Sequence, residues 1–205
     1  MTEETILNAH NKQEWEPAHT TEHILKRCRW CNLANPLYLD YHDNEWGVPV
    51  HDDGKLFEML VLEGFQAGLS WECILNKRVA FRDAFDGFDV HKVAGYGDEK
   101  IESLMQNPGI VRNRLKIHSA VTNAAVFMTI QEEFGSFDSY LRTFTKGETV
   151  YEYDKATSPL SDAISKDLRK RGMKFVGSKI IYAYLQAIGV VNSHETGCFL
   201  YRRKP

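Results

Sequence analysis

One acidic residue of this chain, Glu63, falls within an otherwise apolar helical pattern. Leu56, Leu60 and Glu63 are spaced i, i+4 and i+7, so all three fall on one face of a helix. Because that face should be buried, the carboxyl group must be hydrogen-bonded, neutralised or kept for a ligand.

The segment after this glutamate breaks the helix and brings further side chains to the same place. Gly64 and Gly68 permit a sharp turn or a close backbone approach, and Ser70 can cap a new helix that begins at Trp71. An acid, a loop with an exposed Leu69 and an indole ring should therefore meet. The alternative is an ordinary turn between helices whose glutamate reaches solvent.

Four residues could bind a metal ion. His194 and Cys198 are spaced i and i+4, on one side of a helical turn, and Cys28 and His42 supply two more ligands near the other end of the core. Such a Cys2His2 set can hold one structural zinc ion in tetrahedral geometry. Cys31 is a competing ligand, because Cys28-x-x-Cys31 is itself a metal-binding spacing. Four unrelated residues are the other interpretation.

Residues 107–113 separate two helical patterns and contain a Pro-Gly pair, which is typical of a helix-hairpin-helix. In that motif a turn at Gly109 directs backbone N–H groups toward a DNA phosphate. The next helix adds its positive end and a basic group, Arg112, Arg114 and Lys116, with no acid among them. Contacts of this kind do not depend on the DNA sequence.

A second basic run spans Lys166–Lys179 and holds six basic residues, Lys174 among them, against the single acid Asp167. Local basic surface of this kind is compatible with nucleic-acid contact even though the net charge is −3. An ordinary solvated helix face gives the same pattern.

The elements that must position these residues are helices joined by short loops, since no run of alternating β-branched residues occurs. Helices are expected from Pro36, after a cap at Asp52 or Asp53, and over residues 71–85, 90–95, 100–106, 112–134, 137–144, 160–171 and 180–188. Residues 145–157 read as a loop. We expect one all-α domain over residues 28–205, preceded by a polar extension at residues 1–27.

The 205 residues suffice for a sizeable core. No apolar stretch is long enough to span a bilayer, and residues 1–27 lack the apolar core of a signal peptide. We therefore expect a soluble cytoplasmic protein that needs no membrane, whose four cysteines bind metal or are buried rather than oxidised.

Three longer runs carry a resemblance to a known family: PLYLDYHDNEWG at residues 36–47, LEGFQAGLSW at residues 62–71 and KRGMKFVG at residues 170–177. They closely resemble the constitutive bacterial 3-methyladenine DNA glycosylases of type I, in the helix-hairpin-helix superfamily. The resemblance covers residue 28 to the C-terminus. It departs at one extra residue between Cys28 and His42, and residues 1–27 have no counterpart in it.

The resemblance implies an enzyme of base excision repair that removes 3-methyladenine from alkylated double-stranded DNA as the free base. It also implies one structural zinc ion per chain, bound by Cys28, His42, His194 and Cys198. Carried over by position, the base-binding residues are Tyr38, Tyr41, Glu63 and Trp71 with Trp30 beside them, Glu63 is catalytic, and Leu69 fills the gap left in the duplex. Contacts to DNA are expected from Gly109, Arg112, Arg114 and Lys174, and the chain is expected to act as a monomer.

Related glycosylases place an Asp on the helix after the hairpin, or a Lys within the hairpin to cut the strand. Here no acid lies between Gly109 and Gln131, and the lysine position reads Asn113, so strand cutting is not expected. Because methylation at N3 makes the adenine cationic and a good leaving group, extruding and holding the base should suffice. Aromatic faces favour the cation by roughly 0.5–2 kcal/mol, and a carboxylate at Glu63 can accept from the exocyclic amine.

Two other functions are compatible with these residues. A glycosylase for another alkylated base, such as 3-methylguanine, would need a similar pocket. The other is a non-catalytic, zinc-stabilised DNA-binding module that has lost its activity, and the intact set of Glu63, Tyr41 and Trp71 argues against such a loss.

Overall fold

The computed structural model describes residues 25–201, and the structural statements below concern this part of the chain. The predicted extension at residues 1–27 lies outside the described residues except for its last three.

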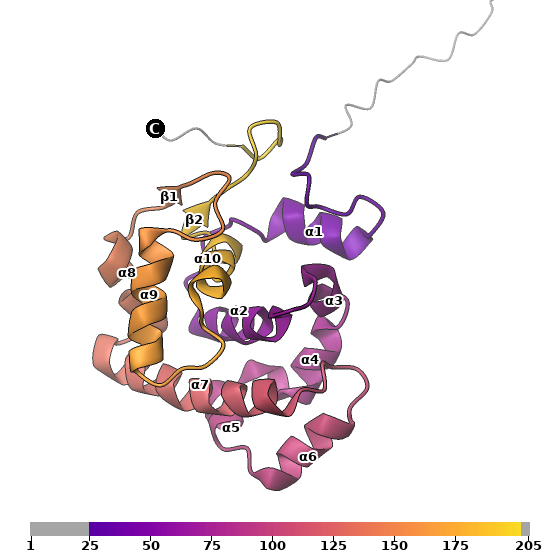
Figure 1. Cartoon of the computed structure of the whole chain (residues 1–205), viewed down its shortest axis with the longest axis vertical. Helices are drawn as coiled ribbons and strands as arrows, with labels where there is room; N and C mark the ends of the chain where they lie inside the picture. Colours follow the sequence, from indigo (N-terminus) through magenta and orange to yellow (C-terminus); the bar gives the residue numbers. More distant parts are fainter. Residues whose placement is uncertain (1–24, 202–205) are drawn as a thin grey trace, which may run out of the picture.

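Helices make up most of the described chain (Figure 1). They are α1 (Pro36–Asn44), α2 (Asp53–Gln66), α3 (Trp71–Leu75), α4 (Arg78–Ala84), a short 3-10 helix (Asp86–Phe88), α5 (Val90–Ala94), α6 (Asp98–Gln106), α7 (Arg114–Phe134), α8 (Phe137–Thr145), α9 (Pro159–Lys170) and α10 (Ser178–Ala187). Two short strands, β1 (Val150–Tyr151) and β2 (Val191–Asn192), pair in parallel with Val150 opposite Val191. The all-α prediction is thus confirmed for residues 25–201, apart from this ladder, one strand of which lies in the predicted loop.

Side chains at the helix starts explain several boundaries. The Asn35 side chain accepts from the N–H of Leu37, next to a proline at the first helical position of α1. Asp52 accepts from the N–H of Lys55 at 2.9 Å and caps α2. Ser70 caps α3 in the predicted way. These caps satisfy N–H groups that have no partner within their own helix.

The prediction of a single helix over residues 71–85 is wrong, because the structure has two helices there, α3 and α4. At the break, the N–H of Lys77 bonds to the carbonyl of Ile74, three residues back, instead of four. The Asn76 side chain accepts from Asn35 Nδ2 at 3.0 Å. The break is thus held by a contact to a segment far away in the sequence, which the apolar spacing of the helix itself does not reveal.

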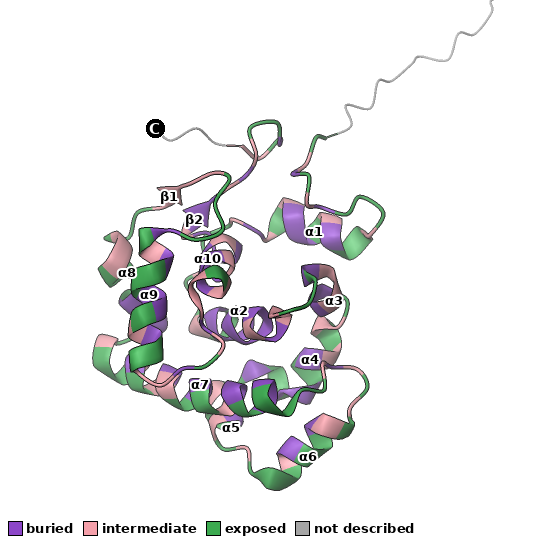
Figure 2. Ribbon diagram, viewed as in Figure 1, coloured by how far each residue is buried: buried purple, intermediate pink, exposed green. Residues whose placement is uncertain are grey.

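Helix α2 lies at the centre of the fold and is buried along most of its length (Figure 2). It packs against α10, α7, α8 and α3. At its start, the Asp53 carboxylate accepts from Gln131 Nε2 at 2.7 Å and from the N–H of Phe137 at 2.8 Å, which joins α2 to α7 and α8. The helix that carries Glu63 is therefore held in place by packing along its sides and by the hydrogen bonds of Asp53 at its first turn.

Between residues 25 and 201, no helix combines the length and the apolar character that crossing a bilayer would require.

Candidate active site and metal centre

The predicted metal ligands meet in one buried cluster. The ligand atoms of Cys28, His42, His194 and Cys198 all lie within 4.8 Å of one another. Cys28 Sγ is 3.6 Å from His194 Nδ1, and Cys198 Sγ is 3.5 Å from His42 Nε2. Two sulfur and two nitrogen ligands around a tetrahedral zinc ion would lie about 3.4–3.8 Å apart, given the usual zinc–ligand bond lengths. The donor set and its spacing therefore fit a closed zinc site.

The surroundings of the cluster orient its ligands. His42 Nδ1 lies 2.8 Å from Asp43 Oδ1, and Arg27 Nε donates to the same carboxylate at 2.8 Å. The contact between His42 Nδ1 and Asp43 orients the imidazole ring so that Nε2 faces the cluster, an arrangement that is usual for metal-binding histidines. Cys31 is not part of this cluster, and its thiol instead donates a hydrogen bond to the Tyr38 carbonyl at 3.6 Å.

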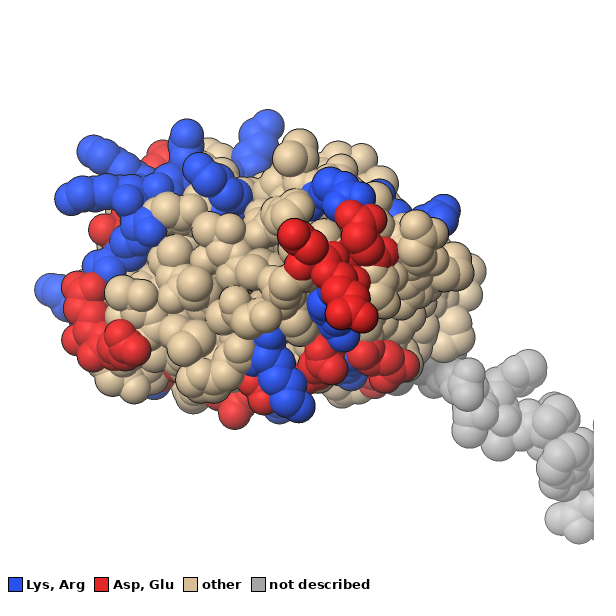
Figure 3. Space-filling view, turned by 90° about the horizontal axis from the view of Figure 1, so that it is seen from below, with Lys and Arg blue, Asp and Glu red and all other residues tan. Residues whose placement is uncertain are grey.

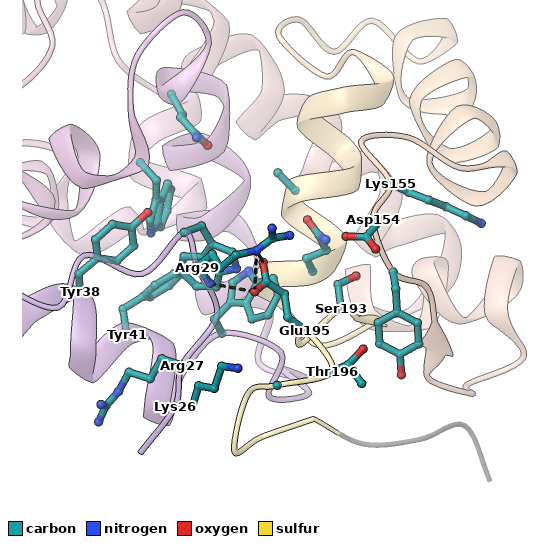
Figure 4. Close-up of a pocket in the computed structure, with 18 of the residues that line it drawn as sticks. Lys26, Arg27, Arg29, Tyr38, Tyr41, Asp154, Lys155, Ser193, Glu195 and Thr196 are labelled. Carbon is teal, nitrogen blue, oxygen red and sulfur yellow. Dashed lines mark hydrogen bonds and ion pairs between the residues drawn. The ribbon is translucent and has the colours of Figure 1, made fainter. Parts of the chain in front are cut away.

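A cavity of about 540 Å³ opens beside this cluster, a size in the usual range for small-molecule sites. Figure 4 shows Tyr38 and Tyr41 on one side of it, Asp154 and Lys155 on the other, and Arg29 in between. The predicted base-binding residues all line it: Trp30, Tyr38, Tyr41, Glu63 and Trp71. Trp46 and Gln66 also line the cavity and were not predicted, although both lie in the runs that carry the family resemblance.

Two polar atoms in the cavity wall are buried and have no hydrogen-bond partner among the described residues, Glu63 Oε2 and Trp71 Nε1. Glu63 is only 4% exposed, and burial raises the pKa of its carboxyl group to about 8. With this pKa the carboxyl group of Glu63 should be mostly protonated at pH 7, whereas the sequence predicts a carboxylate. Because unpaired buried polar atoms are costly, these two are best explained by a ligand that supplies their partners.

Aromatic rings connect the cavity to the metal cluster. Tyr41 and Trp71 lie 5.2 Å apart between ring centroids and are tilted by 42°. Trp30 contacts both Trp46, at 4.7 Å, and His42, at 5.2 Å. A flat ring in the cavity would therefore lie against indole and phenol faces that rest on a histidine of the Cys/His cluster.

The loop after α2 places one apolar side chain at the surface. Gly68 has φ +79°, a conformation that favours glycine, and the N–H of Leu69 donates to the Gln66 carbonyl at 2.6 Å. Leu69 is 41% exposed, as the sequence predicts.

The hairpin between α6 and α7 differs from the prediction at Gly109. Its N–H donates to Asn107 Oδ1 at 2.8 Å and is therefore already bonded within the protein. The hydrogen bonds found among residues 25–201 leave the N–H groups of Val111 and Arg112 without an acceptor. Glycine is needed at position 109 because an added Cβ would lie 2.9 Å from the Cβ of Ala80.

The three basic residues after the hairpin do not form one surface. Arg112 is exposed, Arg114 makes a bidentate ion pair with Glu102 with an Nη2–Oε2 distance of 2.9 Å, and Lys116 is only 5% exposed. Lys174 is exposed. In Figure 3, Lys and Arg side chains gather at the upper left and mix with acids at the right. Arg112 and Lys174 are thus better placed than Arg114 to meet an anion.

The chain is similar to known proteins along most of its length. Residues 30–201 match the family model for methyladenine glycosylases. The DNA-3-methyladenine glycosylase 1 of Escherichia coli is 45% identical over 184 residues, which is 86% of this chain and 97% of that protein. A crystal structure of 3-methyladenine DNA glycosylase I matches with a TM-score of 0.83 and 44% identity, covering 86% of this chain and 100% of the other. A structure of a substituted 3-methyladenine DNA glycosylase I in complex with 3-methyladenine matches with a TM-score of 0.81 and 34% identity. The match covers 84% of this chain and 96% of the other.

Proposed function

Since this chain belongs to the methyladenine glycosylase family, we propose that it removes 3-methyladenine from alkylated double-stranded DNA as the free base. The observation that carries this proposal is the pair of unpartnered atoms, Glu63 Oε2 and Trp71 Nε1, in an aromatic cavity. One accepts and one donates, and both lie beside ring faces that suit a flat cation. A purine extruded from the duplex offers both kinds of partner.

The cavity can distinguish the methylated base from adenine by charge. The faces of Tyr41 and Trp71 attract a cation, by roughly 0.5–2 kcal/mol. A bound cation also favours the ionised form of Glu63, whose pKa of about 8 keeps it neutral in the empty cavity. Binding of 3-methyladenine in DNA would then release the Glu63 proton and create a charge-assisted hydrogen bond, whereas neutral adenine would cause neither change.

Hydrolysis of the cationic nucleotide needs little further catalysis. As the bond between C1′ and N9 breaks, its electron pair stays with the base and neutralises the positive charge. Water adds its oxygen to C1′ and loses a proton, which leaves an abasic sugar and free 3-methyladenine. The protein contributes by holding the extruded base against Glu63 and the aromatic rings, so an aspartate on α7 is not required.

The same geometry supports a reaction without strand cutting. Cutting would need an amine that attacks C1′. Lys116, on the first turn of α7, is buried, and its ammonium group already donates to two backbone carbonyls. Position 113 in the hairpin is Asn, whose side chain caps α7.

We propose that DNA phosphates lie on the N–H groups of Val111 and Arg112, with Arg112 and Lys174 adding charge. The hairpin backbone and side chains would hold the duplex without reading its sequence. Leu69, exposed at the end of a tight turn, would fill the space of the extruded nucleotide.

We also propose one structural zinc ion at Cys28, His42, His194 and Cys198. Four protein ligands leave no open coordination position, so the ion would stabilise the fold and take no part in the reaction.

The function is tested by incubating the purified protein with methylated duplex DNA and identifying the released bases by mass spectrometry. Free 3-methyladenine is the expected product, with intact strands and no base released from unmethylated DNA. Release of 3-methylguanine as well would widen the substrate class. DNA binding without release of any base would overturn the proposal in favour of a non-catalytic DNA-binding module.

A further inference from the structure

Lys116 is a buried lysine without a carboxylate partner among its described hydrogen bonds. Its Nζ donates to the carbonyl of Phe65 at 2.8 Å and to that of Ala67 at 2.6 Å. These carbonyls end α2, whose last turn has no basic side chain of its own. The terminal carbonyls of a helix carry partial negative charge and need donors, and Lys116 supplies both the donor and the charge.

The carbonyls that Lys116 contacts lie between Glu63 in the cavity and Leu69 in the loop after α2. Glu63 lies two residues before the first contacted carbonyl and four before the second, and Leu69 lies two residues after the second one. Lys116 itself is on the first turn of α7, directly after the hairpin. One ammonium group therefore connects the hairpin helix, the base cavity and the exposed leucine.

A third segment meets at the same place. Phe175, in the loop between α9 and α10, has its ring centroid 6.0 Å from Lys116 Nζ, and its Cβ would lie 3.6 Å from a Cβ on Gly64. Phe175 has φ +52°, an unfavourable backbone conformation for a bulky residue. Asn123 of α7 holds the preceding residue, Lys174, by two hydrogen bonds of 2.9 and 2.8 Å to its backbone.

The cost of this arrangement indicates a role beyond packing. Burial lowers the pKa of Lys116 and disfavours its charge. An apolar side chain at this position would avoid the loss of ammonium hydration, which is expensive away from water. What the ammonium adds, and an apolar side chain cannot, is a pair of hydrogen bonds that join α7 to the end of α2.

We propose that Lys116 is a positioning residue, which keeps the Leu69 loop and the Glu63 cavity in register with the DNA-bound hairpin. The inference rests on the proposed glycosylase function. When the hairpin lies on the phosphates, Leu69 must enter the duplex as the base enters the cavity. A loop free to shift by an ångström would hold the base less often in the reactive position.

The test compares Lys116→Met with Lys116→Arg and with Ile117→Val, a matched control on the same turn of α7 whose side chain is fully buried in the core. Three quantities are measured for each: the single-turnover rate of 3-methyladenine release at saturating protein, the Kd for free 3-methyladenine, and hydrogen exchange of the backbone N–H groups of residues 67–70. For Lys116→Met we expect a rate at least tenfold lower, a Kd within about twofold of the wild type, and faster exchange. Lys116→Arg should recover part of the rate, and Ile117→Val should keep it.

A normal rate and normal exchange in folded Lys116→Met would overturn the proposal. An equal loss of rate in Ile117→Val would show that Lys116 only contributes to general stability and does not position the loop. If the wild-type protein released no base, the proposed function would fail by itself. Hydrogen exchange would still decide whether Lys116 holds the loop.

Discussion

Trp46 and His194 lie edge to face, with ring centroids 4.7 Å apart and planes at 89°. The first residue lines the cavity and the second belongs to the metal cluster. The wall against which a base would lie is therefore supported by a residue of the Cys/His cluster, although the cluster itself is not expected to take part in the reaction.

We predict one zinc ion per chain by metal analysis of the purified protein. Cys198→Ser should lose the metal and lower the melting temperature, because it opens a link between the two ends of the fold. Cys31→Ser, at a buried cysteine outside the cluster, is the matched control and should keep full metal content. Metal kept by Cys28→Ser and lost from Cys31→Ser would reassign that ligand.

Removal of the metal by a chelator should also weaken binding of free 3-methyladenine in protein that is still folded. The reason is the contact between His194 and Trp46, which supports the cavity wall. Calorimetric titration of the chelated and the reloaded protein measures the change. Equal affinity in the chelated and reloaded protein would show that Trp46 keeps its place in the cavity wall without the metal.

Glu63→Gln should bind methylated duplex DNA more weakly and release 3-methyladenine from it more slowly, because the base is cationic while it is still attached to the sugar. A charge-assisted hydrogen bond is worth about 1.5–3 kcal/mol, so the loss should be roughly ten- to a hundredfold. If Glu63 instead serves the fold, Glu63→Gln would lower thermal stability and leave the affinity near that of the wild type. Both quantities can be measured on one preparation.

Glu63 should also make stability depend on pH. Burial raises its pKa from an ordinary 4.5 to about 8, so between these values the folded protein holds a proton that the unfolded chain releases. The contribution of this group is complete below pH 4.5 and is lost as the pH rises toward 8, by at most about 1.4 kcal/mol per pH unit. Urea unfolding should therefore show that Glu63→Gln gains stability relative to the wild type as the pH rises. A constant difference across this range would contradict the assignment.

Arg112→Ala and Lys174→Ala should each weaken binding to all duplexes alike and reduce the slope of log affinity against log salt by about one unit. Arg114→Ala is the control and should change the slope less, because the Arg114 guanidinium is paired with Glu102. Equal slopes for all three variants and the wild type would show that these residues are ordinary surface.

Local features of this fold could be predicted from the sequence. The helical spacing that ends at Glu63 correctly predicts a buried face, and Ser70 caps a helix because its hydroxyl needs a partner only three residues away. Both predictions depend on contacts within a few residues. The Cys/His ligands are spread over more than 160 positions, and the family resemblance rather than their spacing identified the set.

Long-range contacts could not be predicted in this way. The break at Asn76 depends on Asn35, and the two-residue ladder depends on a strand near the C-terminus. Lys116 was grouped with two surface arginines because its neighbours in the sequence are basic. Its acceptors are 51 and 49 residues away. The local signal for its burial is the helical spacing i, i+4 and i+8 that it shares with the buried Ala120 and Ala124.

The metal cluster also imposes an order on the synthesis of this protein. Cys28 and His194 are separated by 166 positions. At about 5–20 residues per second, a ribosome needs roughly 8–33 s to add the second ligand after the first. During that interval the nascent chain already contains Glu63 and the aromatic side chains, but not the histidine on which Trp46 rests. The binding cavity therefore cannot be complete until His194 has been added and the cluster has closed.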